Sequence, residues 1–145
     1  MRNKEIYEIE ERDLKDVKSI LLELFNNKIT YENIKEFYRI CQKNDNVFLY
    51  GYYINDKIVG MIFLDIAILP SGKKATVWNL GVLEQYRNRG IATKLITKVE
   101  NVVKEQYKDI KNIRLFSSYK RKNAHKLYEH LGYNSDDFKA FYKNI

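Results

Sequence analysis

Residues 76–103 read TVWNLGVLEQYRNRGIATKLITKVENVV, and the rest of the chain is interpreted outward from them. The extended apolar run from Thr76 to Val82 predicts a strand, which a basic turn follows. After the turn, apolar side chains recur at helical spacing and predict one buried helix face. They are Ile91, Leu95, Ile96, Val99, Val102 and Val103.

The turn at 85–92 has the chemistry of an anion site. Gly90 removes a side chain where a ligand must approach closely, and Ala92 keeps a nearby position small. The amides of a helix's first turn point outward at the positive end of the helix dipole. Arg87 and Arg89 add positive charge at the same place. A pyrophosphate fits such a turn.

Composition predicts one globular domain over residues 1–145, because 45% of the residues are hydrophobic and 31% are charged. No apolar run approaches the roughly 20 residues that span a bilayer, and no signal peptide is visible. The single cysteine, Cys41, cannot form an internal disulfide and has no metal-ligand spacing around it. We therefore expect a cytoplasmic protein without a metal site, in which Cys41 is a small buried side chain.

The net charge of +7 raises the possibility of nucleic-acid binding. Acidic residues are nevertheless spread along the whole chain, and a local excess of positive charge occurs only near residues 87–94 and at 120–122. A polyanionic cofactor explains these two basic clusters at least as well as DNA or RNA does. The expected binding partner is therefore an anionic small molecule, with no membrane involved.

The remaining elements follow from hydrophobic periodicity, helix caps and turn residues. In chain order we expect a strand at Ile6–Ile9, a helix that Asp13 caps and that ends near Asn26–Asn27, and a helix that Thr30 caps and that Asn44–Asn46 terminates. Three strands follow, at Val47–Ile54, at Lys57–Leu69 and up to Val82. The chain then continues with a helix at Gly90–Gln106, a strand at Asn112–Ser117, a helix at Lys122–Leu131 with Gly132 as its C-terminal glycine, and a last strand within Tyr133–Tyr142.

Two motifs carry a resemblance to a known family. Arg87 to Ala92 matches the Arg/Gln-x-x-Gly-x-Gly/Ala signature of the GNAT family of N-acetyltransferases, and Asn79 to Val82 is similar to that family's fourth strand. Downstream, residues 123–133 read NAHKLYEHLGY and resemble the family's Ala-x-x-x-Tyr-x-x-x-Gly-Phe motif. The resemblance covers the second half of the chain directly and the first half by its pattern of elements.

The resemblance implies an α+β fold, with a mixed, mostly antiparallel sheet flanked by about four helices. It implies that strands four and five separate and expose backbone to the pantetheine arm of acetyl-coenzyme A. Gly81 then marks a bulge or a close backbone approach, or it packs under a neighbouring side chain. The implied cofactor-binding residues are Leu80, Gly81, Val82, Arg87, Asn88, Arg89, Gly90, Ile91, Ala92, Thr93, Arg121 and Asn123.

Acetyl transfer also needs an acid for the leaving thiolate and a route for the amine's proton. The resemblance assigns the acid to Tyr128. Many members of the family have an acidic residue on strand four, where this chain has Asn79, which cannot take a proton. Asp65, Glu84 and ordered water are therefore the candidates for the base.

The sequence thus predicts an acetyl-coenzyme A dependent enzyme that acetylates a primary amine by direct attack on the thioester. The alternative is a non-catalytic module that binds acyl-coenzyme A or RNA. The resemblance places residues 26–31 in the wall of the acceptor site. The acceptor itself, and the choice between a monomer and a homodimer, stay open.

Overall fold

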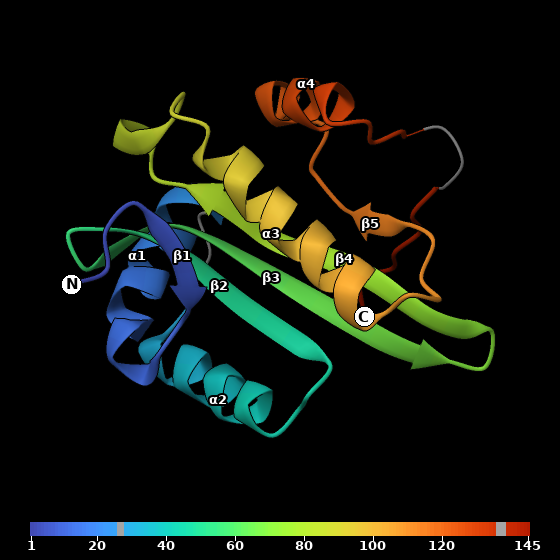
Figure 1. Cartoon of the computed structure of the whole chain (residues 1–145), viewed down its shortest axis with the longest axis horizontal. Helices are drawn as coiled ribbons and strands as arrows, with labels where there is room; N and C mark the ends of the chain where they lie inside the picture. Colours follow the sequence, from blue (N-terminus) through green and yellow to red (C-terminus); the bar gives the residue numbers. More distant parts are fainter. Residues whose placement is uncertain (26–27, 136–138) are drawn as a thin grey trace. The chain divides into compact units, whose positions relative to one another are not determined.

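The structure is a computed structural model that describes residues 1–25, 28–135 and 139–145 (Figure 1). It divides into two compact units, Met1–Leu115 and Phe116–Ile145, which we describe separately. The first unit contains β1 (Glu5–Glu8), the short 3-10 helix η1 (Glu11–Asp13), α1 (Leu14–Phe25), α2 (Tyr31–Gln42), β2 (Val47–Ile54), β3 (Lys57–Leu69), β4 (Gly72–Val82), the 3-10 helix η2 (Glu84–Tyr86), α3 (Ile91–Gln106) and β5 (Ile113–Leu115). The second contains α4 (Lys122–His130).

The described strands form one mixed sheet in the order β1-β2-β3-β4-β5. β1 to β4 run antiparallel to their neighbours, and β5 is parallel to β4. The turn between β2 and β3 has positive φ at both Asn55 (50°) and Asp56 (64°), as expected from two residues that tolerate this conformation. The predicted mixed, mostly antiparallel sheet with flanking helices is confirmed.

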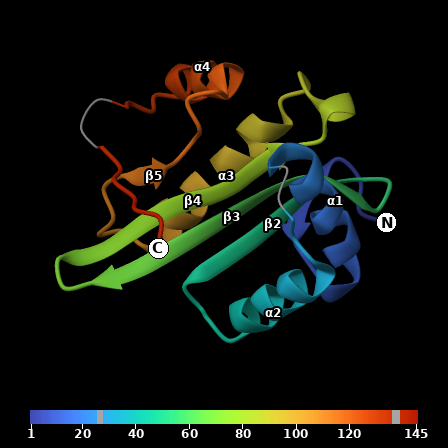
Figure 2. The same ribbon diagram turned by 180° about the vertical axis from the view of Figure 1, so that it is seen from behind.

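The helices of the first unit cover both faces of this sheet (Figures 1 and 2). On one face, Phe37 of α2 meets Phe63 of β3 with 5.0 Å between ring centroids. On the other face α3 packs so closely on Gly60 that an added Cβ would lie 3.1 Å from Ile91 Cγ2. The alternation of side chains along β3 therefore places α1 and α2 opposite α3. The six apolar residues predicted to face inward on α3 are all buried.

The helix caps agree with the sequence at Thr30 and differ at Asp13. Thr30 precedes α2, and its hydroxyl accepts a hydrogen bond from the amide of Asn33 at 3.2 Å. Asp13 lies inside η1, and its carboxylate accepts from the amide of Glu10 at 3.0 Å. The expected end of the first helix at Asn26–Asn27 lies outside the described residues.

The C-terminal predictions need two corrections. β5 is shorter than expected, because it pairs only along Ile113–Leu115. Described residues 133–135 and 139–142 contain no strand, although a last strand was predicted within Tyr133–Tyr142. The amide of Tyr133 donates to the carbonyl of Tyr128, so this segment begins folded back on α4 and not in a sheet ladder.

Smaller differences lie at the element ends. β1 begins at Glu5, one residue before the predicted strand. α4 ends at His130, and the glycine after it, Gly132, has φ 92° and donates to the carbonyl of Glu129, as a C-terminal glycine does. Among the described helices, none has both the length and the apolar character needed to cross a membrane.

Candidate functional site

A bulge interrupts the pairing of β3 with β4. The register shifts between Met61 and Phe63, and Asn79 stands opposite this shift with φ 53°. Asparagine is one of the few residues with a side chain that enter this left-handed region at modest cost. The bulge therefore lies at Asn79, two residues before the glycine, Gly81, at which the sequence suggested it. The sequence feature that indicates this bulge is an asparagine, Asn79, within an otherwise apolar strand end.

β4 and β5 separate just before the bulge. Their parallel ladder covers only Ala75–Val77 against Ile113–Leu115, whereas β4 continues to Val82. The predicted separation of these two strands is thus confirmed. The bulge and the part of β4 beyond its ladder with β5, which we call the open edge of β4, lie on the same five residues, of which the last three are buried.

Val82 turns its backbone groups toward the open edge of β4. The amide of the next residue, Leu83, donates to the carbonyl of Val59 on the β3 side. Because successive residues of an antiparallel strand alternate in direction, the N–H and C=O of Val82 face away from β3. The Nε of Arg87 reaches that carbonyl at 3.1 Å.

The first turn of α3 has no side-chain cap within the described residues. Gly90 is the N-cap residue, with φ 76° and ψ 10°, and its carbonyl accepts the first helical hydrogen bond from the amide of Lys94. Residues 87–90 are exposed. The amides at the start of α3 therefore keep the outward, uncapped arrangement expected of an anion site.

Both arginines of the turn also bind the turn itself. While Arg87 reaches the carbonyl of Val82, Arg89 donates to the carbonyl of Gln85 at 3.2 Å. The guanidinium of Arg89 also lies over the ring of Tyr86, 5.3 Å from its centroid. A guanidinium has five N–H donors, so each arginine keeps further donors for a ligand. From the sequence, the two arginines were predicted only to add positive charge, and their hydrogen bonds to nearby backbone carbonyls were not predicted.

Gly81 packs under a side chain from α1. A Cβ added to Gly81 would lie 2.2 Å from Leu24 Cδ1, far inside van der Waals contact. Of the alternatives open in the sequence, packing under a neighbouring side chain therefore describes Gly81, and the bulge belongs to Asn79. The sequence near residues 79–82 does not indicate that Leu24, 57 positions earlier in the chain, packs on Gly81.

Asp65 lies on β3, far from the end of β4. It pairs with Thr76, whereas Val82 pairs with Gly60. Five residues of strand separate Gly60 from Asp65, roughly 17 Å at about 3.4 Å per residue. Asp65 instead neighbours Cys41 of α2, whose pKa is raised to about 11 by burial and by the charge of Asp65. Cys41 is half-buried. The structure does not bring Asp65 to the open edge of β4.

The second unit carries the other predicted site residues on and beside α4. Arg121 is the N-cap residue of α4, and Asn123 is exposed in its first turn. Tyr128 is buried, with 7% of its surface exposed. Burial raises the pKa of Tyr128, and the positive charge of Arg121 opposes this rise.

A shallow groove of about 530 Å³ lies beside the first half of α3, on its β1 side. Thr93, which was predicted to bind the cofactor at the end of the basic turn, also lines this groove. The groove is lined by Lys4, Glu5, Ile6, Tyr52, Thr93, Lys94 and Thr97. The open edge of β4 lies across the sheet from β1, so this groove is separate from it.

Comparison with known proteins identifies the family. Residues 4–133 match the model of the acetyltransferase (GNAT) family. The chain therefore belongs to the GNAT acetyltransferases, as the two motifs predicted. No curated protein matches it.

Solved structures share the fold of this chain. A transcriptional regulator from Bacillus halodurans C-125 aligns with a TM-score of 0.85 and 21% identity, over 97% of this chain and 99% of that one. An aminoglycoside acetyltransferase, meta-AAC0020, from an uncultured soil metagenomic sample in complex with trehalose gives 0.81 and 19%, over 97% and 95%. AAC(6')-Iy in complex with the bisubstrate analogue CoA-S-monomethyl-acetylneamine gives 0.79 and 17%, over 97% of both chains.

Proposed function

We propose that this protein is an acetyl-coenzyme A dependent N-acetyltransferase that moves the acetyl group to a primary amine by direct attack on the thioester. One observation carries the proposal. β4 leaves β5 after Val77, and the start of α3 at Gly90, which has no side-chain cap among the described residues, follows the end of β4 at Val82 by eight residues. An extended ligand with a diphosphate at one end matches that combination of strand edge and helix start.

The donor's parts are assigned by chemistry. The diphosphate is assigned to the amides and side chains of residues 87–93, a short segment that holds the first-turn amides of α3 and the two exposed arginines. The pantetheine arm runs along Leu80–Val82, where amide groups of the arm can pair with the strand edge. Arg121 and Asn123 are proposed as further contacts to the donor from their positions in the second family motif.

The reaction needs one bond made and one broken. The amine nitrogen attacks the thioester carbonyl carbon, the C–N bond forms, and the C–S bond breaks. Charge that develops on the carbonyl oxygen is assigned to the N–H of Val82, which faces the open edge. The departing thiolate takes its proton from the phenol of Tyr128, because a phenol with an ordinary pKa of about 10 is already protonated at neutral pH.

The amine must lose a proton, and its acceptor is assigned to water. A base acting directly has to lie within hydrogen-bond reach of the amine, whereas Asp65 is roughly 17 Å along the strand from the level of Val82. Asp65 is therefore proposed to act through ordered water or through its charge. Glu84 is exposed and lies two residues after Val82, so along the chain its carboxylate is nearer to Val82 than that of Asp65 is.

Acceptors with several amines are the first to test, because three of the similar structures are described as aminoglycoside acetyltransferases. The same fold serves many acceptors, so fold does not choose among them. A panel of aminoglycosides, polyamines and peptides should be assayed by release of the free thiol from acetyl-coenzyme A, alongside calorimetric titration with acetyl-coenzyme A.

Saturable binding of acetyl-coenzyme A and amine-dependent thiol release support the proposal. Binding without turnover on any amine would favour a non-catalytic acyl-coenzyme A module. Absence of binding, together with tight salt-sensitive binding of RNA, would exclude the proposed donor site.

A further inference from the structure

The last turn of α1 contacts β4 and the segment after it at two points. Leu24 lies directly on the backbone of Gly81, and the carboxylate of Glu23 accepts a hydrogen bond from the amide of Glu84 at 3.0 Å. These neighbouring residues of one helix therefore contact both ends of residues 81–84. That segment joins the open edge of β4 to the basic turn.

The Leu24 contact is a steric requirement at residue 81. A Cβ there would lie 2.2 Å from Cδ1, 3.5 Å from Cγ and 3.7 Å from Cβ of Leu24, so a methyl group would occupy the place of the Leu24 side chain. The φ of Gly81 is not in the left-handed region, so the backbone itself would accept another residue. Glycine is needed there because α1 lies so close.

The Glu23 contact fixes the first residue of η2. From Glu84 onward the chain closes on itself: the amide of Tyr86 donates to Leu83, and that of Arg87 donates to Glu84. The side chain of Arg87 then reaches back to the carbonyl of Val82. The direction of residues 87–90 therefore follows from where Glu84 is held.

We infer that the last turn of α1 positions the donor-binding turn, with Glu23 and Leu24 acting as positioning residues for residues 84–90. Neither side chain needs to touch the donor. Their effect is to fix the position of the arginines and of the start of α3 relative to the open edge of β4. The inference concerns the same site as the proposed function and rests on it.

A matched pair of variants isolates the Glu23 contact. Glu23→Gln and Glu23→Ala both remove the negative charge, but only glutamine keeps an oxygen that accepts from the amide of Glu84. Their difference therefore measures the hydrogen bond and not the charge. Glu36→Ala removes an exposed carboxylate from α2 and serves as the control for charge alone.

We expect Glu23→Ala to weaken binding of coenzyme A by about three- to tenfold relative to Glu23→Gln, the range that a single hydrogen bond supports. Glu36→Ala should bind within about twofold of the wild type. Amide hydrogen exchange of residues 84–90 should quicken in Glu23→Ala only. Equal affinity and equal exchange in the alanine and glutamine variants would overturn the inference.

The Leu24 contact is tested by a double-mutant cycle. Gly81→Ala should weaken coenzyme A binding and quicken exchange in residues 84–90, and adding Leu24→Ala should restore part of both by making room for the methyl group. Additive losses would contradict the inference. A wild type that binds no coenzyme A would instead remove the proposed function, and the exchange measurements alone would then decide the positioning role.

Discussion

Tyr128 is the residue on which the chemical step of the proposed reaction depends. Its phenol is buried, and burial raises its pKa from an ordinary value at which the phenol is already protonated at neutral pH. We expect Tyr128→Phe to lower kcat about 100-fold, the lower end of what a general acid contributes, with little change in KM for acetyl-coenzyme A. Initial rates of thiol release at saturating substrate measure this.

The control for Tyr128 is Tyr119→Phe, which removes a hydroxyl from a side chain of the same unit that is 91% exposed. This variant should turn over at the wild-type rate. Undiminished kcat in Tyr128→Phe would exclude the phenol as the acid.

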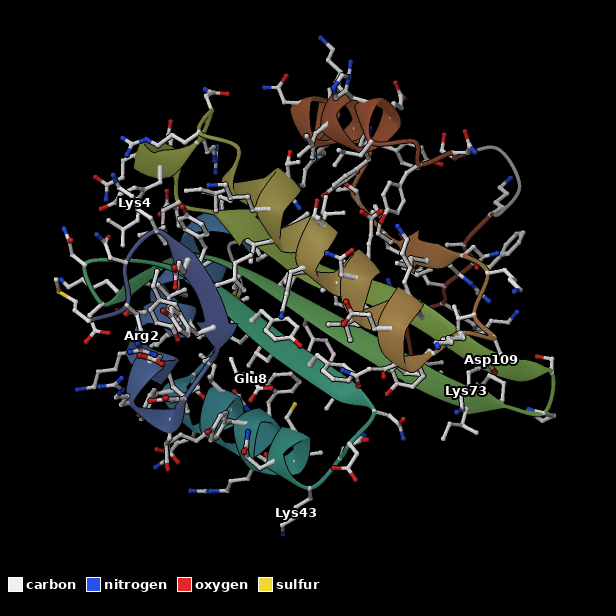
Figure 3. All side chains as sticks on the ribbon, viewed as in Figure 1. Arg2, Lys4, Glu8, Lys43, Lys73 and Asp109 are labelled. Carbon is white, nitrogen blue, oxygen red and sulfur yellow. The ribbon has the colours of Figure 1, made fainter. Side chains whose placement is uncertain are left out.

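A buried ion pair near the N-terminus makes a prediction about stability. Arg2, labelled in Figure 3, donates two hydrogen bonds to the carboxylate of Asp13, at 2.9 and 3.0 Å, and its guanidinium lies 4.0 Å from the centroid of the Tyr53 ring. The hydroxyl of Tyr53 donates to the same carboxylate at 2.8 Å. Burial alone would raise the pKa of Asp13, but the hydrogen bonds from Arg2 and Tyr53 outweigh it and lower the pKa.

We expect Asp13→Asn to reduce the free energy of unfolding by about 2 kcal/mol at pH 7, because the guanidinium of Arg2 would lose its buried counterion and keep only the more exposed carboxylate of Asp56, 2.8 Å away. Because the pKa of Asp13 is lower in the folded state than the unfolded value of about 3.9, its carboxylate stabilises the fold at pH values above about 3.9. This stabilisation is lost as the pH falls through the folded pKa. The difference from the wild type should therefore shrink below about pH 4.

Urea unfolding at pH 7 and at pH 3 measures both effects of Asp13→Asn. Arg12→Ala breaks the exposed pair between Arg12 and Glu10 and should cost less than about 1 kcal/mol. A loss in Asp13→Asn no larger than that in Arg12→Ala would contradict the role of the buried pair.

At the scale of elements, the turn from β4 into α3 depends on one left-handed residue. Gly90→Ala should destabilise the fold by about 1 kcal/mol, because a side chain at φ 76° is strained, and should weaken acetyl-coenzyme A binding about tenfold by re-aiming the first helical turn. Gly72→Ala is the matched control: Gly72 has φ 115° at the start of β4, and in both glycines an added Cβ meets no atom within 4 Å.

Chemical unfolding and calorimetric titration separate the two effects of these glycine variants. Both should lose stability, but only Gly90→Ala should lose affinity for acetyl-coenzyme A. Equal affinity in the two variants would show that the start of α3 does not hold the donor.

At the scale of the whole molecule, the net charge of +7 makes binding of an anion sensitive to salt. The dissociation constant for acetyl-coenzyme A should rise severalfold as ionic strength is raised from about 0.05 M to about 0.5 M, because ions screen the exposed arginines of the turn. Pantetheine, which lacks phosphate, should show little such change when used as a competitor. Salt-independent binding of acetyl-coenzyme A would argue against a diphosphate on residues 87–93.

Local patterns were sufficient to predict the elements that depend on neighbouring residues. The buried face of α3, the cap at Thr30 and the turn at Asn55–Asp56 each follow from side chains within a few positions of one another. The basic turn at Gly90 belongs to the same group, because its glycine, its charges and its helix start are contiguous. The family followed from two such local motifs.

Contacts between distant segments were decided by tertiary structure alone. The length of β5 depends on how far it pairs with β4, and Tyr133 donates to the carbonyl of Tyr128 on α4 at the start of the range where a strand was predicted. Asp65 is distant from the end of β4 because of strand register, and Gly81 is needed because Leu24 packs on it. Register and close packing join residues far apart in the chain, so no short window of sequence contains both partners.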